Sequence, residues 1–161
     1  MSDRVITNPV KMTENWRVAM TALMNLFLTT HRTMTEASSI GPTELLIYVT
    51  VSVANVQKLM RERVIPECYA ATDILPREWV VPISRNAIAT ASGLPRETVR
   101  RRVAAMIETG ILIEDARGGV TLPIGVIKDR GFEPVLEAMM TDFARTAEAL
   151  LRIGVVEVKS D

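Results

Sequence analysis

Five arginines stand close together in the middle of the chain and give the clearest sign of chemistry in the sequence. From residue 85 to residue 102 they are accompanied by one acidic residue, Glu97, whereas the whole chain has 19 basic and 19 acidic residues and no net charge. Guanidinium groups bind phosphate oxygens and guanine edges through paired N–H donors. The local excess of positive charge therefore indicates a surface for a polyanion, formed by Arg85, Arg96, Arg100, Arg101 and Arg102.

A short helix, a tight turn and a second helix are expected to position these arginines. Ser84 is suited to cap the first helix, and Gly93 supplies the left-handed conformation that a sharp turn between helices requires. Pro95 suits the opening turn of the second helix. The apolar stripe of that helix is expected to contain Val99, Val103, Met106 and Ile107, and Gly110 to close it. At 100° per residue, Arg101 then lies nearly opposite Val103, on the outer face.

A β-hairpin is expected directly after the second helix. Residues 111–113 and 120–122 have the composition of strands, and Ala-Arg-Gly-Gly at 116–119 indicates a tight turn. Arg117 falls at the expected tip, where it is predicted to reach a phosphate or the minor groove. The two glycines that follow Arg117 allow the backbone a close approach to a ligand.

The order of these features resembles the winged helix-turn-helix of bacterial regulators such as the GntR and MarR families. The resemblance covers about a quarter of the chain and rests on Gly93-Leu94-Pro95, Thr98-Val99-Arg100-Arg101, Val103, Met106 and Gly110-Ile111-Leu112. It implies a homodimeric repressor or activator that reads a palindromic operator. The motif is central and we expect no large effector domain after it, unlike in the GntR family. Helices on both sides of the motif are more similar to MarR-like architecture.

The resemblance assigns a role to each residue of the predicted DNA-binding surface. Arg101 and Arg96 are expected on guanine edges, and Glu97 is expected to accept a hydrogen bond from cytosine N4. Contacts to phosphates are expected from Arg85, Thr98, Arg100, Arg102 and Arg117. Ser84, Pro95 and Gly118 complete the predicted surface.

The remaining sequence predicts a mostly α fold. Apolar residues recur at helical spacing in residues 13–30 and 132–153, and residues 44–63 are assigned as a buried helix although 48–53 alternate like a strand. The predicted fold class is a winged helix-turn-helix core of three helices and a β-hairpin wing, flanked by N- and C-terminal dimerisation helices. The predicted domains are an N-terminal helical extension (1–36), a DNA-binding domain (37–123) and a C-terminal helix (124–161).

Three segments show no clear periodicity of apolar residues. The first residues and residues 155–161 are expected to be a ragged start and a frayed tail. Residues 64–81 contain Pro66 and Pro76 and are expected to form a loop with one short helical turn. Such a long loop is often functional, so a role in binding a ligand or a partner stays open.

Composition and motifs also argue against several classes of protein. A single cysteine, Cys68, excludes an intrachain disulfide and favours the cytoplasm. The longest apolar stretch is too short to span a membrane, so no membrane partner is expected. Without a Cys/His cluster, a glycine loop for phosphate or a carboxylate pair, we expect no enzyme, no cofactor and no metal. The only histidine, His31, is expected at the end of the first helix, where a positive charge would interact favourably with the helix dipole.

The function that the sequence favours is a sequence-specific, double-stranded-DNA-binding transcription regulator that acts as a homodimer. The alternative is a winged-helix module that binds a protein and no DNA, which the zero net charge and the apolar flanking helices would suit. A third hypothesis is a small-molecule effector that binds between the flanking helices and the core. The operator, the direction of regulation and the effector are not determined by the sequence.

Overall fold

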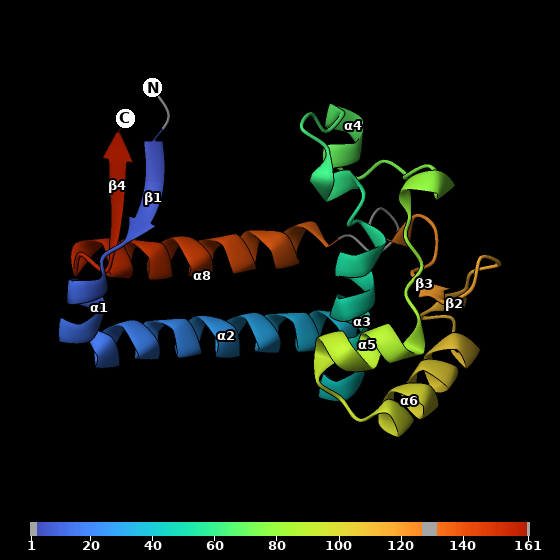
Figure 1. Ribbon diagram of the computed structural model, residues 1–161. Coiled ribbons are helices and arrows are strands. Elements are labelled where there is room, and N and C mark those ends of the chain that lie inside the picture. Colours follow the sequence, from blue (N-terminus) through green and yellow to red (C-terminus); the bar gives the residue numbers. More distant parts are fainter. Residues whose placement is uncertain (1–2, 127–131, 161) are drawn as a thin grey trace. The chain divides into compact units, whose positions relative to one another are not determined.

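A computed structural model describes residues 3–126 and 132–160 of the chain. The described residues are mostly helical and include two small antiparallel sheets, as Figure 1 shows, which confirms the expected mostly helical fold. The chain forms two compact units, which are described separately. One contains residues 1–37 and 133–161, and the other contains residues 38–132.

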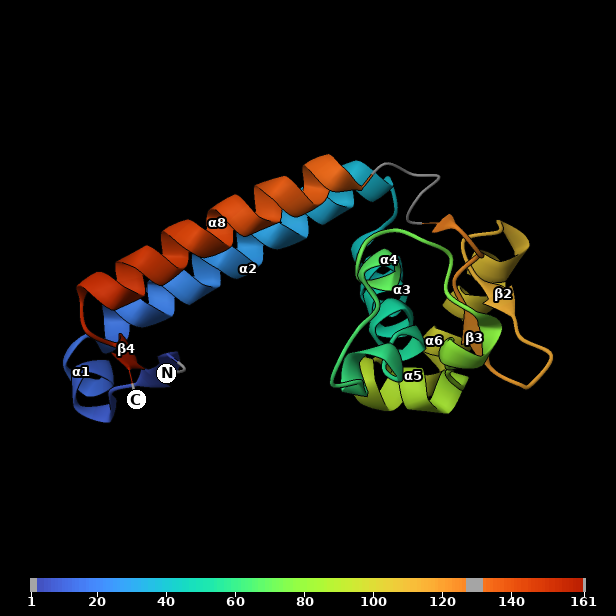
Figure 2. The same cartoon turned by 90° about the horizontal axis from the view of Figure 1, so that it is seen from above.

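The first unit is a pair of long helices closed by a two-stranded ribbon. Helices α2 (Trp16–Ser38) and α8 (Glu133–Arg152) lie side by side in both views (Figures 1 and 2). The short helix α1 (Pro9–Glu14) precedes α2, and Asn8 caps it by accepting a 3.1 Å hydrogen bond from the backbone N–H of Lys11. The amide of Asn8 also donates to Glu157 at 2.7 Å, which ties the two ends of the unit together.

The two chain ends were expected to be irregular, and this prediction is wrong. Strand β1 (Asp3–Thr7) pairs antiparallel with β4 (Val156–Ser160), so that Asp3 faces Ser160 and Thr7 faces Val156. The pairing joins segments about 150 residues apart in sequence, and neither segment is stable as a strand without the other. No local pattern therefore reveals it.

The first long helix extends further than predicted. Helix α2 continues to Ser38, so His31 lies inside it and not at its end. The residues after position 28 are rich in threonine, which obscures the apolar period. Within the helix these hydroxyls bond to carbonyls of the preceding turn, as in the 3.1 Å bond from Thr29 to Leu26 and the 2.8 Å bond from Thr35 to His31. Threonine is thereby accommodated in a helix that its propensity does not favour.

The first unit has a small buried core. Ala19, Leu150 and Val155 are buried, with Ala22, Ile153 and Val156 packed against them. Ten large apolar side chains of its two long helices are instead mostly exposed, and they are Trp16, Val18, Leu23, Met24, Phe27, Leu28, Leu136, Met140, Phe143 and Leu151.

The second unit packs three helices against a hairpin. Its helices are α3 (Pro42–Asn55), α5 (Arg85–Ser92) and α6 (Arg96–Glu108), and β2 (Ile113–Glu114) pairs antiparallel with β3 (Val120–Thr121). The buried core draws on the three helices, β3 and the segment before β2, through Ile47, Val51, Ile88, Ala89, Val99, Val103, Met106, Leu112 and Val120.

The segment between α3 and α5 corrects one prediction and confirms another. Helix α3 ends at Asn55, so the predicted helix over 44–63 is too long, and a single 3-10 turn, η1 (Leu59–Arg61), follows it. The expected loop contains one short helix, α4 (Glu67–Ala70), as predicted, and a 3-10 turn, η2 (Arg77–Trp79). No single helix of the described residues is long and apolar enough to cross a membrane; only α2 and α3 taken together, across a break, reach that length and composition.

Candidate functional site

The turn between α5 and α6 has the local geometry that the sequence predicts. The hydroxyl of Ser84 accepts a 3.2 Å hydrogen bond from the N–H of Ala87 and caps α5. Gly93 adopts a φ of 71° and donates its N–H to the carbonyl of Ala89, which ends the helix. Pro95 is the residue just before α6, where its missing N–H costs nothing. The chain therefore turns within the three residues that separate the two helices.

Helix α6 buries one stripe and exposes the opposite one. Val99 and Val103 are fully buried, and Met106 is 2% exposed. Arg96 and Arg101 are exposed, and neither forms a salt bridge within residues 3–126 and 132–160. These two guanidinium groups consequently keep all their N–H donors available for a partner.

The other arginines of the two helices are already paired. Arg100 donates two hydrogen bonds to Glu97, at 2.8 and 2.6 Å, and these bonds lower the pKa of the Glu97 carboxyl. The remaining pairs are Arg85 with Glu114 at 2.6 Å and Arg102 with Glu44 at 2.7 Å. The Arg85 and Arg100 pairs are largely exposed, and such pairs contribute only about 0–1 kcal/mol to stability. Little stability is therefore lost when a ligand separates either pair, but Glu97 and Glu114 are then left without their arginines.

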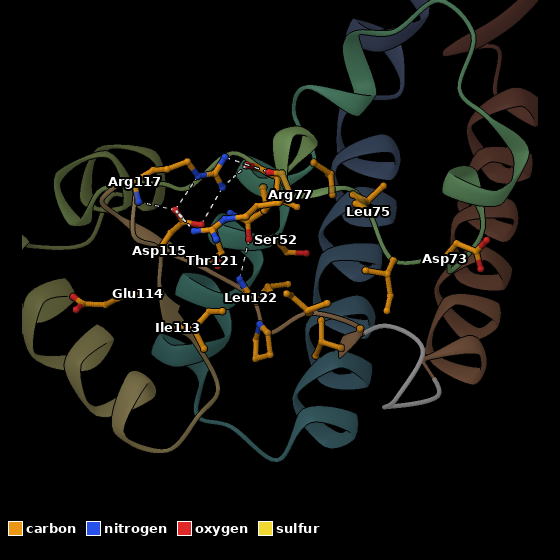
Figure 3. Close-up of a pocket in the computed structure, with 18 of the residues that line it drawn as sticks. Ser52, Asp73, Leu75, Arg77, Ile113, Glu114, Asp115, Arg117, Thr121 and Leu122 are labelled. Carbon is orange, nitrogen blue, oxygen red and sulfur yellow. Dashed lines mark hydrogen bonds and ion pairs between the residues drawn. The ribbon is translucent and has the colours of Figure 1, made fainter.

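The hairpin arginine does not extend from the tip. Two nitrogens of Arg117 donate to the carboxylate of Asp115, at 2.8 and 2.9 Å, and the guanidinium also donates to the carbonyls of Arg77 and Val80. Figure 3 shows this network of hydrogen bonds. It lowers the pKa of Asp115 well below its usual range. Arg117 thus fastens the hairpin to the loop before α5, and its predicted contact with phosphate would require these bonds to be released.

Residues from three segments line a hollow of about 370 Å³, which we call the arginine hollow. The start of α5, the start of α6 and the hairpin each contribute to it. Its lining residues are Ser84, Arg85, Asn86, Arg96, Glu97, Arg100 and Gly119. Arg85 is paired with Glu114 and Arg100 with Glu97, so the excess of positive charge in this hollow is that of Arg96. Five of the predicted site residues therefore lie together.

The other predicted residues lie on neighbouring surfaces. Thr98 is half-buried on α6, and Arg101 and Arg102 directly follow the lining residue Arg100 on the same helix. Gly118 is exposed in the hairpin turn at a φ of 89°. None of these residues lines the arginine hollow, so they would meet a ligand only if it extended along α6 or onto the hairpin.

Two lining residues were not assigned to the site from the sequence. Asn86 is the second residue of α5, and its position directly after the capping Ser84 and Arg85 was the available signal. Gly119 was expected to allow the backbone a close approach to a ligand but was not counted among the site residues; its backbone lies against Ile83, where a Cβ would come within 2.8 Å of the Ile83 carbonyl oxygen. That contact is non-local and leaves no mark in the hairpin sequence itself.

The site has the chemistry of an anion-binding surface. No group of three His, Cys, Asp or Glu side chains among the described residues lies close enough to hold a metal ion. The arginine hollow offers guanidinium groups, a serine hydroxyl and an amide, which are the groups that bind phosphates and base edges. No protein-family model, curated protein or solved structure matches the chain.

Proposed function

We propose that this protein is a transcription regulator that binds double-stranded DNA as a homodimer. In this proposal the second unit is a winged helix-turn-helix: α6 enters the major groove, and the hairpin is the wing beside the DNA backbone. The observation that carries the proposal is the arginine hollow, because residues from α5, α6 and the wing converge there with an excess of positive charge.

The geometry of α6 supports direct contact with bases. An α-helix with its side chains is about 10–12 Å in diameter and fits the roughly 12 Å width of a major groove, along which the 13 residues of α6 would extend for about 20 Å. Arg101 is exposed, unpaired and opposite the buried stripe, so it would reach a guanine edge without breaking an ion pair. Arg96, at the first position of the helix, is equally unpaired. Arg85 and Arg100 would exchange their carboxylates for phosphates at the two rims of the groove.

The first unit supports a dimer of two copies of this chain. Its two long helices form one layer, and a single layer of two helices leaves an apolar face open to water. The ten exposed side chains of α2 and α8 offer apolar area of the order of the roughly 800 Å² per partner that a stable interface buries. A second copy would complete a four-helix bundle with two-fold symmetry, which suits an operator with two half-sites.

The alternative is a winged-helix module that binds a protein. The observation that favours it is the pairing of Arg85, Arg100 and Arg102 with carboxylates, which neutralises much of the local charge. An acidic partner protein would then contact only the unpaired arginines. The experiment on DNA binding separates the two functions.

DNA binding is tested by selecting sites from random duplexes and measuring affinity by fluorescence anisotropy at several salt concentrations. The wild-type protein is expected to bind a selected duplex with an affinity that falls steeply with salt. Arg101→Ala should lower this affinity by about 1–3 kcal/mol and relax the sequence preference. Arg61→Ala is the matched control, because Arg61 is exposed in the same unit and lies outside the proposed site. No binding to any duplex at low salt would refute the proposal.

The dimer is tested by light scattering, which should give a mass of about 36 kDa, twice the 17.8 kDa of one chain. Phe143→Glu places a charge in the exposed apolar face of α8 and should yield the mass of a single chain. Val64→Glu is the control, since Val64 is the most exposed large apolar residue and belongs to the other unit. A wild-type mass of 17.8 kDa would refute the dimer.

A further inference from the structure

The second unit contains another hollow, which is distinct from the arginine hollow and which we call the apolar hollow. It has a volume of about 430 Å³ and lies between the end of α3, the loop at 72–80 and the hairpin (Figure 3). Its walls are mainly apolar and include Val56, Leu75, Val80, Ile113, Leu122 and Val126. This volume falls within the roughly 300–1,000 Å³ that ligand-binding cavities occupy.

Three hydroxyl groups line the apolar hollow without a hydrogen bond to another described residue, and they belong to Ser52, Thr121 and the exposed Thr72. Thr121 is only 3% exposed, and neither it nor Ser52 on α3 has a side-chain hydrogen bond to another described residue. No polar side-chain atom of the described residues is both sealed from solvent and unpaired. The Thr121 hydroxyl is therefore reached from the hollow that it lines. A hydroxyl in the wall of an otherwise apolar hollow is a point where a bound molecule can be oriented by a hydrogen bond.

The side-chain amide of the neighbouring Asn55 is not available to bond to a ligand. Asn55 also lines the hollow, but its Nδ2 donates to the carbonyl of Val81 and its Oδ1 accepts from the N–H of Leu122. The hydrogen bonds available to a ligand in the interior therefore come from Ser52 and Thr121.

The charged residues around the apolar hollow favour a neutral ligand. Asp115 is held by Arg117 at 2.8 Å and lies 3.6 Å from Arg77, and Glu114 is paired with Arg85. Asp73 is exposed and lies apart from this group in Figure 3. An anionic or cationic ligand would have to compete with carboxylate–guanidinium pairs that are already formed.

We infer that the apolar hollow binds a small, neutral, mainly apolar molecule that carries one hydrogen-bonding oxygen. Its apolar body contacts the walls, and its oxygen bonds to Thr121 and Ser52. Because the walls include both the hairpin and the loop at 72–80, the bound molecule contacts both sides of the Arg117 network. The site does not depend on DNA binding, and its test does not involve DNA.

The probe for this site is prodan, a neutral fluorescent ketone whose emission shifts to the blue in an apolar environment. Wild-type protein is expected to give a saturable blue shift with one site per chain. Thr121→Val keeps the shape and removes the hydroxyl, so affinity should fall about 2- to 12-fold, the equivalent of one hydrogen bond. Val56→Phe fills the hollow and should abolish the shift, with thermal melting as the check that the protein is folded. Thr141→Val is the control, because Thr141 is exposed on α8 and its hydroxyl bonds to Glu137.

Two outcomes overturn the inference. The first is the absence of a saturable shift with the wild-type protein. The second is equal affinity of the wild-type protein, Thr121→Val and Val56→Phe, because prodan would then bind elsewhere, for example on the exposed apolar face of α2 and α8. A protein that binds prodan as expected but no DNA would refute the proposed function and leave this inference intact.

Discussion

Replacement of Asn55 by alanine is expected to lower the free energy of unfolding of the second unit by about 2–5 kcal/mol. Asn55 is 4% exposed, and its amide joins the end of α3 to two other segments. Its Nδ2 donates to the carbonyl of Val81 at 2.8 Å, and its Oδ1 accepts from the N–H of Leu122 at 2.9 Å. Each hydrogen bond contributes about 1 kcal/mol net, and each partner left unsatisfied at these part-buried positions costs up to about 1–3 kcal/mol.

Urea unfolding measured by tryptophan fluorescence tests this prediction. The chain has two tryptophans, and a Trp16→Phe background leaves Trp79 of the second unit as the reporter. The free energy of unfolding of small proteins falls by about 1–3 kcal/mol per molar urea, so the urea midpoint of Asn55→Ala should be lower by roughly 1–3 M. Asn86→Ala is the control: Asn86 is exposed in the same unit, so its loss should change stability by no more than about 0.5 kcal/mol.

A second variant distinguishes the hydrogen bonds from mere packing. In Asn55→Asp at neutral pH the carboxylate still accepts from Leu122 but cannot donate to the Val81 carbonyl. Burial raises the pKa of such a carboxyl, and its protonated form regains the donor. The difference from wild type should therefore shrink as the pH falls from 7 to about 5. If Asn55→Ala unfolded at the same urea concentration as the wild-type protein, the reasoning would be refuted.

Three further predictions concern the hairpin. Gly119→Ala should destabilise the second unit by about 1–3 kcal/mol more than Gly118→Ala, because both glycines have positive φ but only a Cβ at 119 meets the Ile83 backbone; equal urea midpoints would contradict this. Because the pKa of Asp115 is lowered in the folded protein, its ionised carboxylate stabilises the fold at pH values above the ordinary aspartate pKa of about 3.9. This stabilisation is lost as the pH falls further below that value. The stability difference between wild type and Asp115→Asn should therefore shrink between pH 5 and pH 2, and a constant difference would exclude this ionic contribution. Arg117→Ala should weaken DNA binding without changing its salt slope if Arg117 only holds the hairpin, whereas a slope lower by about 1 would indicate a phosphate contact.

The helix–turn–helix segment was predictable from the sequence because its signals are local. Ser84 caps the helix that it precedes, Gly93 adopts the left-handed conformation that ends α5, and the stripe from Val99 to Met106 is buried. Each of these features depends on residues within one or two helical turns. The spacing of apolar residues, the caps and the turn glycine all favour the same structure, which is why the prediction of these elements was accurate.

The remaining features depend on contacts between residues far apart in the chain. β1 and β4 stabilise each other across nearly the whole sequence, and α3 ends where Asn55 turns its amide toward Val81 and Leu122. The partner of Arg85 is equally non-local: Glu114 is 29 residues away in the sequence, yet the two side chains meet at 2.6 Å. The sequence therefore predicted which residues are charged and exposed in this region, but not which of them are already paired.

The pairing of the arginines bears on how this chain would discriminate between DNA sequences. Binding to phosphates alone would release Glu97 and Glu114 from Arg100 and Arg85, and would leave two carboxylates beside the anionic backbone. Since the chain has no net charge, little general attraction compensates for this repulsion. Arg101 has no pair to give up, so a guanine edge in the groove is a net gain for it. If the chain binds DNA as proposed, its binding to random sequences should be weak and its affinity should depend on base contacts, which favours specificity over affinity.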